Sequence, residues 1–187
     1  MTVARRLLRK PLTWAALAAL AAAGAFGLSW FQPWKLVVDE TVQEPLISVP
    51  APSPEVPTDD VAEAPAATSG PAVLRQGRFV THEHDTTGTA RVVRTAGGAL
   101  RLELVDLDTS NGPDLRVWLS DQPVREGVAG WSVFDDGEWI ELGRLKGNRG
   151  DQAYAIPAGT DLERLTSVSI WCRRFSVSFG AASLAPT

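Results

Sequence analysis

The chain has 187 residues and a formal net charge of −4, which leaves room for one domain and additional segments. The mildly acidic charge is spread along the sequence, so it gives no footprint of a nucleic-acid-binding protein. The single cysteine, Cys172, excludes a disulfide within the chain. It is either a free thiol, an intermolecular disulfide, a ligand, or a small buried apolar residue.

The N-terminal region has the pattern of a membrane anchor. A basic head at residues 1–11 precedes an uncharged run from Leu12 to Phe31. About 20 apolar residues in a helix are enough to cross a bilayer. We therefore predict a transmembrane helix at residues 12–34, with Trp30, Trp34 and Lys35 at its outer interface.

The charge bias sets the expected orientation. Basic residues before the span and acidic residues after it place the N-terminus in the cytoplasm, because cytoplasmic flanks are enriched in Lys and Arg. We expect a single-pass cell-membrane protein with an extracytoplasmic C-terminal domain in the cell envelope. A cleaved signal peptide is the alternative, with Ala23-Gly-Ala25 as its cleavage site, but the apolar run is longer than a typical signal core.

Residues 35–76 have the composition of a linker. Seven prolines occur between Pro45 and Pro71, together with Ala, Ser, Thr and acidic residues. Such a composition favours extended conformations and buries little apolar surface. We expect a proline-rich spacer that holds the next domain away from the membrane.

Residues 77–187 form the predicted extracytoplasmic domain. Short β-type runs are separated by turns rich in Gly, Asp, Asn and Pro, and no long amphipathic helix is evident. The eight expected strands are Arg78–His84, Thr89–Thr95, Ala99–Leu107, Leu115–Leu119, Trp139–Leu145, Gln152–Ile156 and the two arms of a final hairpin. This pattern predicts an all-β fold, an antiparallel β-sandwich or barrel.

The final hairpin contains Cys172. Val168, Ile170 and Cys172 alternate with Ser167, Ser169 and Trp171, which predicts a strand with one apolar face. The alternation resumes at Phe175, so we place a tight turn at Arg173-Arg174. A nearby arginine lowers a thiol pKa and burial raises it, so the state of Cys172 stays open.

Two further groups of residues have metal-ligating types. His82 and His84, the only histidines, would share a face on a strand and form a chelating pair, with Cys172, Asp85 or Asp114 as further ligands. Asp106, Asp108, Asn111 and Asp114 crowd one segment and supply oxygen ligands suited to calcium. The competing interpretation of the histidines is a solvated strand end. That of the acidic segment is a turn in which Asp and Asn side chains bind their own backbone.

Motifs of well-known enzymes are absent from the sequence. It contains no nucleophile elbow, no phosphate-binding loop, no dinucleotide fingerprint and no CxxC pair. Without an acid–base constellation, enzymatic turnover is uncertain and is not the favoured interpretation.

Several stretches between Gly77 and Leu184 resemble the electron-transfer DM-thirteen domain family, which is often found beside DOMON domains. The matching stretches include Gly77-Arg-Phe79, His84, Gly88-Thr-Ala90, Leu100-Arg-Leu-Glu103, Asn111-Gly-Pro-Asp-Leu115, Val168-Ser-Ile-Trp-Cys172 and Phe179-Gly180. The resemblance implies a β domain with Cys172 as a redox centre, acting as a bare thiol or by holding a prosthetic group such as haem.

The resemblance also assigns other residues. His84 falls on the family's histidine position and His82 does not, which makes His84 the partner of Cys172 as a second ligand, with Asp114 shaping the site. The cofactor is undetermined between haem, a metal and none. We therefore expect a membrane-tethered electron-transfer module with an envelope redox partner, and the alternative is a non-catalytic binding or structural module with a buried core cysteine.

Overall fold

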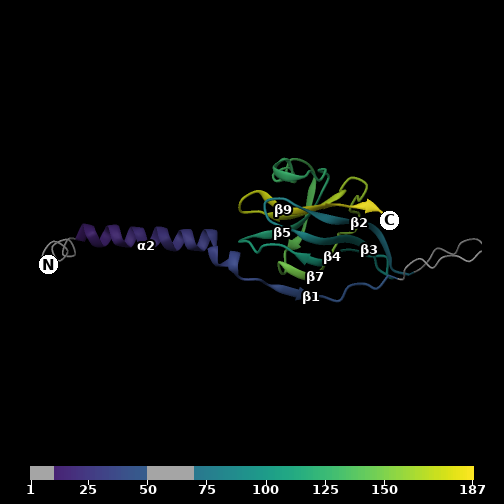
Figure 1. The fold of residues 1–187 in the computed structure, drawn as a ribbon, viewed down its shortest axis with the longest axis horizontal. Coiled ribbons are helices and arrows are strands. Elements are labelled where there is room, and N and C mark those ends of the chain that lie inside the picture. The colour runs from purple at the N-terminus through teal and green to yellow at the C-terminus, as the bar shows by residue number, and fades with distance from the viewer. Residues whose placement is uncertain (1–10, 50–69) are drawn as a thin grey trace, which may run out of the picture.

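The computed structural model describes residues 11–49 and 70–187. The predicted basic head and the most proline-rich part of the predicted linker, at 1–10 and 50–69, lie outside the described residues. The described chain consists of an N-terminal helix, α2 (Pro11–Phe31), a short 3₁₀ helix, η1 (Pro33–Val37), and a curled β domain (Figure 1).

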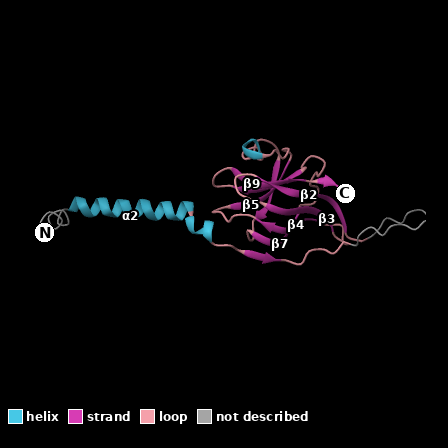
Figure 2. Ribbon diagram, viewed as in Figure 1, coloured by secondary structure: helices cyan, strands magenta, loops and turns pink. Residues whose placement is uncertain are grey.

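Helix α2 confirms the predicted apolar helix. Its 21 residues carry no charge and none of its side chains is buried. The segment Pro11–Lys35 has a mean hydropathy of 1.6 and is long enough to cross a membrane, a test that a signal sequence also passes. The helix ends at Phe31, earlier than predicted, because Gln32 adopts a left-handed conformation and Pro33 lacks the N–H that would continue the helix. It projects away from the β domain (Figure 2).

The all-β prediction for the domain is confirmed. Ten strands form one sheet in the described residues, and the eight predicted strands correspond to β2 through β9. The strands are β1 (Thr41–Gln43), β2 (Ala72–Thr81), β3 (Thr87–Arg94), β4 (Leu100–Asp108), β5 (Leu115–Ser120), β6 (Trp139–Arg144), β7 (Arg149–Ala155), β8 (Ser167–Cys172), β9 (Val177–Ser183) and β10 (Ala185–Pro186). A second 3₁₀ helix, η2 (Gly127–Gly130), lies between β5 and β6.

The sheet is mixed, which corrects the prediction of a purely antiparallel fold. Its order is β1-β7-β4-β3-β2-β9-β8-β5-β6, with β10 paired to β2. The first pair is parallel, with Thr41 opposite Arg149, and the other pairs are antiparallel. Consecutive strands β6 and β7 lie near opposite ends of this order yet contact one another, so the sheet is curled (Figure 1).

Part of the predicted linker belongs to the sheet. Strand β1 lies within it, and β2 begins at Ala72 rather than after residue 77. The chain after β1 is held by the buried Glu103, whose carboxylate accepts hydrogen bonds from the Ile47 N–H at 3.0 Å and from Arg91 Nε at 2.8 Å. Arg91 also donates to the Ile47 carbonyl oxygen at 3.0 Å. Residues 41–47 are therefore docked on the domain.

The sheet encloses one large apolar core and carries a smaller one on its other side. Val168, Ile170 and Cys172 of β8 face the large core, as predicted from their alternation. Trp171, on the opposite face of β8, packs with Trp118 and Phe134 in the smaller cluster. The segment between β5 and β6, which contributes Phe134, thus covers the second face, so every residue of β8 is buried.

Candidate functional site

Cys172 is the last residue of β8 and lies opposite Leu115 of β5 and Val177 of β9. Its side chain is fully buried. Burial raises the pKa of the Cys172 thiol, while the backbone N–H groups of Phe175, Arg174 and Asp114 act in the opposite direction. The charge of Glu83 also raises this pKa. Burial has the largest effect, so the pKa is raised and the thiol is protonated at neutral pH.

The turn after Cys172 differs from the predicted tight hairpin. It runs over four residues, 173–176, and Ser176 adopts a left-handed backbone with φ of 49°. The Arg173 N–H donates to the Asp114 carbonyl oxygen at 3.0 Å, and the Phe175 N–H donates to the Cys172 carbonyl oxygen at 3.2 Å. Phe175 was predicted to continue the strand, but it lies in the turn and is 45% exposed.

An apolar cavity of about 280 Å³ lies beside this turn. His84 is at its edge, with its ring centroid 3.9 Å from that of Phe179 and its Nε2 3.3 Å from a Glu83 carboxylate oxygen. Phe179 belongs to the same buried cluster as Cys172. His84 therefore packs on a member of the buried cluster that contains Cys172, and Cys172 itself does not line the cavity.

The end of helix α2 forms the other wall of the cavity. Phe31, Pro33 and Lys35 line it from the helix side. Phe31 stacks on Phe175 with ring centroids 5.9 Å apart. Arg174 lies 4.8 Å above the Trp30 ring and donates to the Trp30 carbonyl oxygen. The apolar helix thus contacts the turn that follows Cys172.

The residues expected to bind a metal do not converge. The Asp114 carboxylate accepts hydrogen bonds from Arg116 Nε at 2.8 Å and lies 3.4 Å from Arg144. Within residues 11–49 and 70–187, no group of three or more His, Cys, Asp or Glu side chains is placed to hold a metal ion. Because Cys172 is enclosed and His84 packs on Phe179, these residues as arranged do not fit a haem iron either.

His82 and His84 do not form a chelating pair. Strand β2 ends at Thr81, so the two rings are not on one face of a strand. His82 is buried, its Nδ1 lies 2.8 Å from Ser178 Oγ and its Nε2 donates to the Arg125 carbonyl oxygen at 3.0 Å. Burial lowers the pKa of His82, against the smaller opposing effect of the Arg125 carbonyl.

The acidic segment between β4 and β5 has separate partners for its side chains. Asp108 pairs with Arg149 at 3.2 Å, and the Asn111 amide donates to the Val38 carbonyl oxygen at 3.0 Å. The Asn111 side-chain oxygen accepts from the Gly112 N–H at 2.8 Å. The first of the Asn111 contacts holds the chain that follows η1, and the second stabilises the turn. The oxygen atoms of this segment therefore do not converge on a site for calcium.

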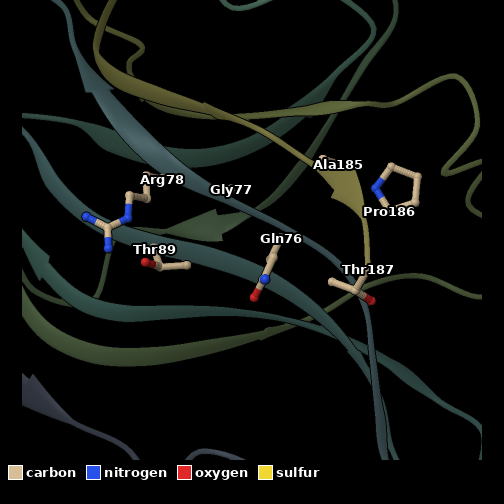
Figure 3. A pocket seen from close by; sticks show the side chains of 7 residues that line it. All are labelled: Gln76, Gly77, Arg78, Thr89, Ala185, Pro186 and Thr187. Carbon is tan, nitrogen blue, oxygen red and sulfur yellow. The ribbon is translucent and has the colours of Figure 1, made fainter. Parts of the chain in front are cut away.

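A second cavity, of about 490 Å³, lies between β2, β3 and the C-terminal residues. Figure 3 shows Gln76, Arg78 and Thr89 on neighbouring strands, with Pro186 and Thr187 beside them. It shares no lining residue with the cavity beside His84. None of the residues proposed from the sequence as ligands or redox groups lines it.

The comparison with protein families identifies the β domain. The family described as Electron transfer DM13 matches residues 78–184, a region that includes both Cys172 and His84. The chain belongs to the DM13 family. No curated protein and no solved structure was found to be similar to the chain.

The DM13 domain contains site residues that the sequence reasoning did not single out. Glu83 pairs with His84, and the backbone N–H of Phe175 acts to lower the pKa of the Cys172 thiol. Helix α2 and the segment after η1 lie outside the DM13 match, yet Phe31 lines the cavity and the Val38 carbonyl oxygen holds Asn111 at its rim. In the sequence, Glu83 stands out only because it precedes His84. No sequence pattern predicts the positions of backbone N–H groups or the contact between the helix end and the domain.

Proposed function

We propose that this DM13 protein is a membrane-tethered, extracytoplasmic electron-transfer module in which Cys172 is the redox group. One observation carries the proposal: the single cysteine of the electron-transfer domain is enclosed at the end of β8, and the turn that follows it borders an apolar cavity edged by His84. The expected association with DOMON domains stays a prediction.

The placement of the helix supports the tethered arrangement. An exposed apolar helix of this length is suited to a bilayer. Its last turn contacts Phe175 and Arg174, so the Cys172 end of the domain would lie at the membrane surface. Basic residues before the span favour the orientation with the domain outside the cytoplasm.

The burial of Cys172 favours one-electron chemistry over thiol–disulfide exchange. Exchange requires attack by an accessible thiolate, whereas this thiol is enclosed and protonated. In a one-electron step the thiol gives an electron to an oxidised carrier and its proton to water, which leaves a thiyl radical. The redox partner would be a one-electron carrier of the cell envelope.

A second candidate function rests on the same burial. A fully enclosed thiol with a raised pKa is also what a packed core residue shows. The domain would then be a non-catalytic binding or structural module whose loops engage a partner.

Replacing Cys172 separates the two candidates. In the electron-transfer module, Cys172→Ala abolishes the voltammetric response of the full-length protein in nanodiscs to one-electron mediators. The same change lowers the free energy of unfolding by about 1 kcal/mol, typical of a core truncation. Val168→Ala, which shortens a buried side chain on the same face of β8, is the matched control and retains the response. Equal responses from the wild type and Cys172→Ala would establish the structural role.

A further inference from the structure

Three tryptophans form a continuous stack on the face of the sheet opposite Cys172. Trp139 of β6 and Trp118 of β5 lie with ring centroids 3.9 Å apart and planes 6° from parallel. Trp118 and Trp171 of β8 follow at 5.0 Å and 24°. The three strands are neighbours in the sheet, so diagonal cross-strand packing holds the rings in this order.

The stack runs from the surface to the interior. Trp139 is 40% exposed, Trp118 is 3% exposed and Trp171 is 1% exposed. Trp171 is joined by a peptide bond to Cys172, whose side chain points into the large core. A path of ring contacts therefore connects solvent to the residue before the cysteine.

The middle ring has a proton acceptor. Trp118 Nε1 donates to a Glu141 carboxylate oxygen at 3.3 Å, and the other oxygen of Glu141 accepts from Arg116 at 2.7 Å. An indole that loses an electron becomes strongly acidic at this nitrogen. Transfer of this proton to Glu141 would convert the radical cation into a neutral radical. The radical would then be localised on Trp118, in the interior of the protein.

Indole is among the most easily oxidised side chains, and the rate of electron tunnelling falls steeply with distance. Several short tunnelling steps between rings in van der Waals contact are therefore faster than one tunnelling step over the whole distance. The stack ends at Trp171, because its next aromatic neighbour, Phe134 at 6.4 Å, is far harder to oxidise.

We propose that Trp139, Trp118 and Trp171 form an electron relay between the interior of the domain and a one-electron acceptor that docks at Trp139. The acceptor takes one electron from Trp139, Trp139 takes one from Trp118, and the Trp118 Nε1 proton passes to Glu141. An electron supplied through Trp171 and the returning proton then restore Trp118. That Cys172 supplies this electron rests on the proposed function, whereas the relay itself does not.

Photo-oxidation of the full-length protein tests the relay. A ruthenium(III) polypyridyl complex, generated by a light flash and an added quencher, serves as the one-electron oxidant. Transient absorption then records the radical. We expect a long-lived neutral tryptophan radical in the wild type, a smaller and shorter-lived signal in Trp118→Phe, and slower formation in Trp139→Phe. In Glu141→Gln the radical cation should replace the neutral radical.

Trp131 provides the matched control. It is partly buried and packs against the large core rather than in the stack. Trp131→Phe should leave the radical signal unchanged, and thermal unfolding verifies that all variants are folded. Equal signals from Trp118→Phe and the wild type, or loss of signal only in Trp131→Phe, would overturn the relay.

Cys172→Ala separates the relay from the proposed function. If Cys172 supplies the electron, the tryptophan radical persists longer in this variant than in the wild type. A relay-dependent radical with the same lifetime in both proteins would support the relay and refute Cys172 as its electron source.

Discussion

At the scale of single residues, His82 is satisfied only in its neutral form. Its Nε2 must carry the proton, because it donates to the Arg125 carbonyl oxygen. Ser169 Oγ donates to Ser178 Oγ at 2.9 Å, which leaves the Ser178 hydroxyl to donate to His82 Nδ1. A second proton on the ring would oppose the Ser178 hydroxyl inside a buried network, so the network and burial both favour the neutral ring.

This arrangement predicts loss of stability in mild acid. Because the folded pKa of His82 lies below its ordinary value of 6.5, the unfolded chain binds more protons as the pH falls through that value. The contribution of His82 is fully present above this pH and is lost as the pH drops toward the folded pKa. Urea unfolding as a function of pH should show the decline, and His82→Gln should flatten it. His84→Gln, at the rim of the cavity, should retain it.

At the scale of elements, the fit of β1 depends on glycines near the start of β7. A Cβ on Gly147 would lie 2.3 Å from the Glu40 carbonyl oxygen, and one on Gly150 would lie 2.0 Å from that of Val42. Asn148 completes the edge, accepting from the Glu40 N–H at 2.6 Å. The β1 backbone can approach β7 only because these positions have no side chain.

Gly147→Ala should therefore release β1 without unfolding the domain. We expect hydrogen exchange of the β1 amides to accelerate and the melting temperature to fall slightly, with little change at β8. Gly97→Ala is the control, since the nearest atom to its Cβ is a Thr95 side-chain oxygen at 3.8 Å. Unchanged exchange at β1 in Gly147→Ala would show that the clash is relieved in another way.

The sequence predicted strands wherever apolar residues repeat with a period of two. This pattern located β2 through β9 and the inward face of Cys172, because side-chain burial generates the alternation. Strand β1 escaped detection since it pairs through its backbone in an acidic, proline-rich stretch. Phe175 was misplaced because an apolar residue in a turn, covered by the helix end, fits the same alternation. Trp171 was placed on the face of its strand opposite the apolar one, and that face is buried too because the segment between β5 and β6 covers it.

At the scale of the whole molecule, both ends of the segment between β1 and β2 are attached to one sheet. Ile47 is held by Glu103 and Arg91, and β2 resumes at Ala72. The chain between helix and domain therefore consists of η1 and the few residues before Thr41, which Asn111 also anchors. This short connection, and not the longer segment between β1 and β2, therefore sets the distance between the helix and the domain.

Insertions at two positions should have different effects. In the proposed membrane-tethered arrangement, a flexible Gly-Ser insertion after Asp60 should leave the height of the domain above the bilayer unchanged, because the insertion lies between two anchored ends. The same insertion after Val38 should increase this height and its variability. The height can be measured by energy transfer between a dye attached to the cysteine of Thr187→Cys and dyes on the nanodisc surface. An equal change in both variants would mean that β1 does not hold the domain.

The pairing of β1 with β7 also bears on how the protein is made. Glu40 and its partner Asn148 are 108 residues apart, so the strand nearest helix α2 has no partner while most of the domain is being synthesised. Contacts of such sequence separation form late, because a long loop must close first. We therefore expect β1 to dock on β7 only after β7 has been synthesised, so the attachment of the segment after helix α2 to the sheet forms late in folding.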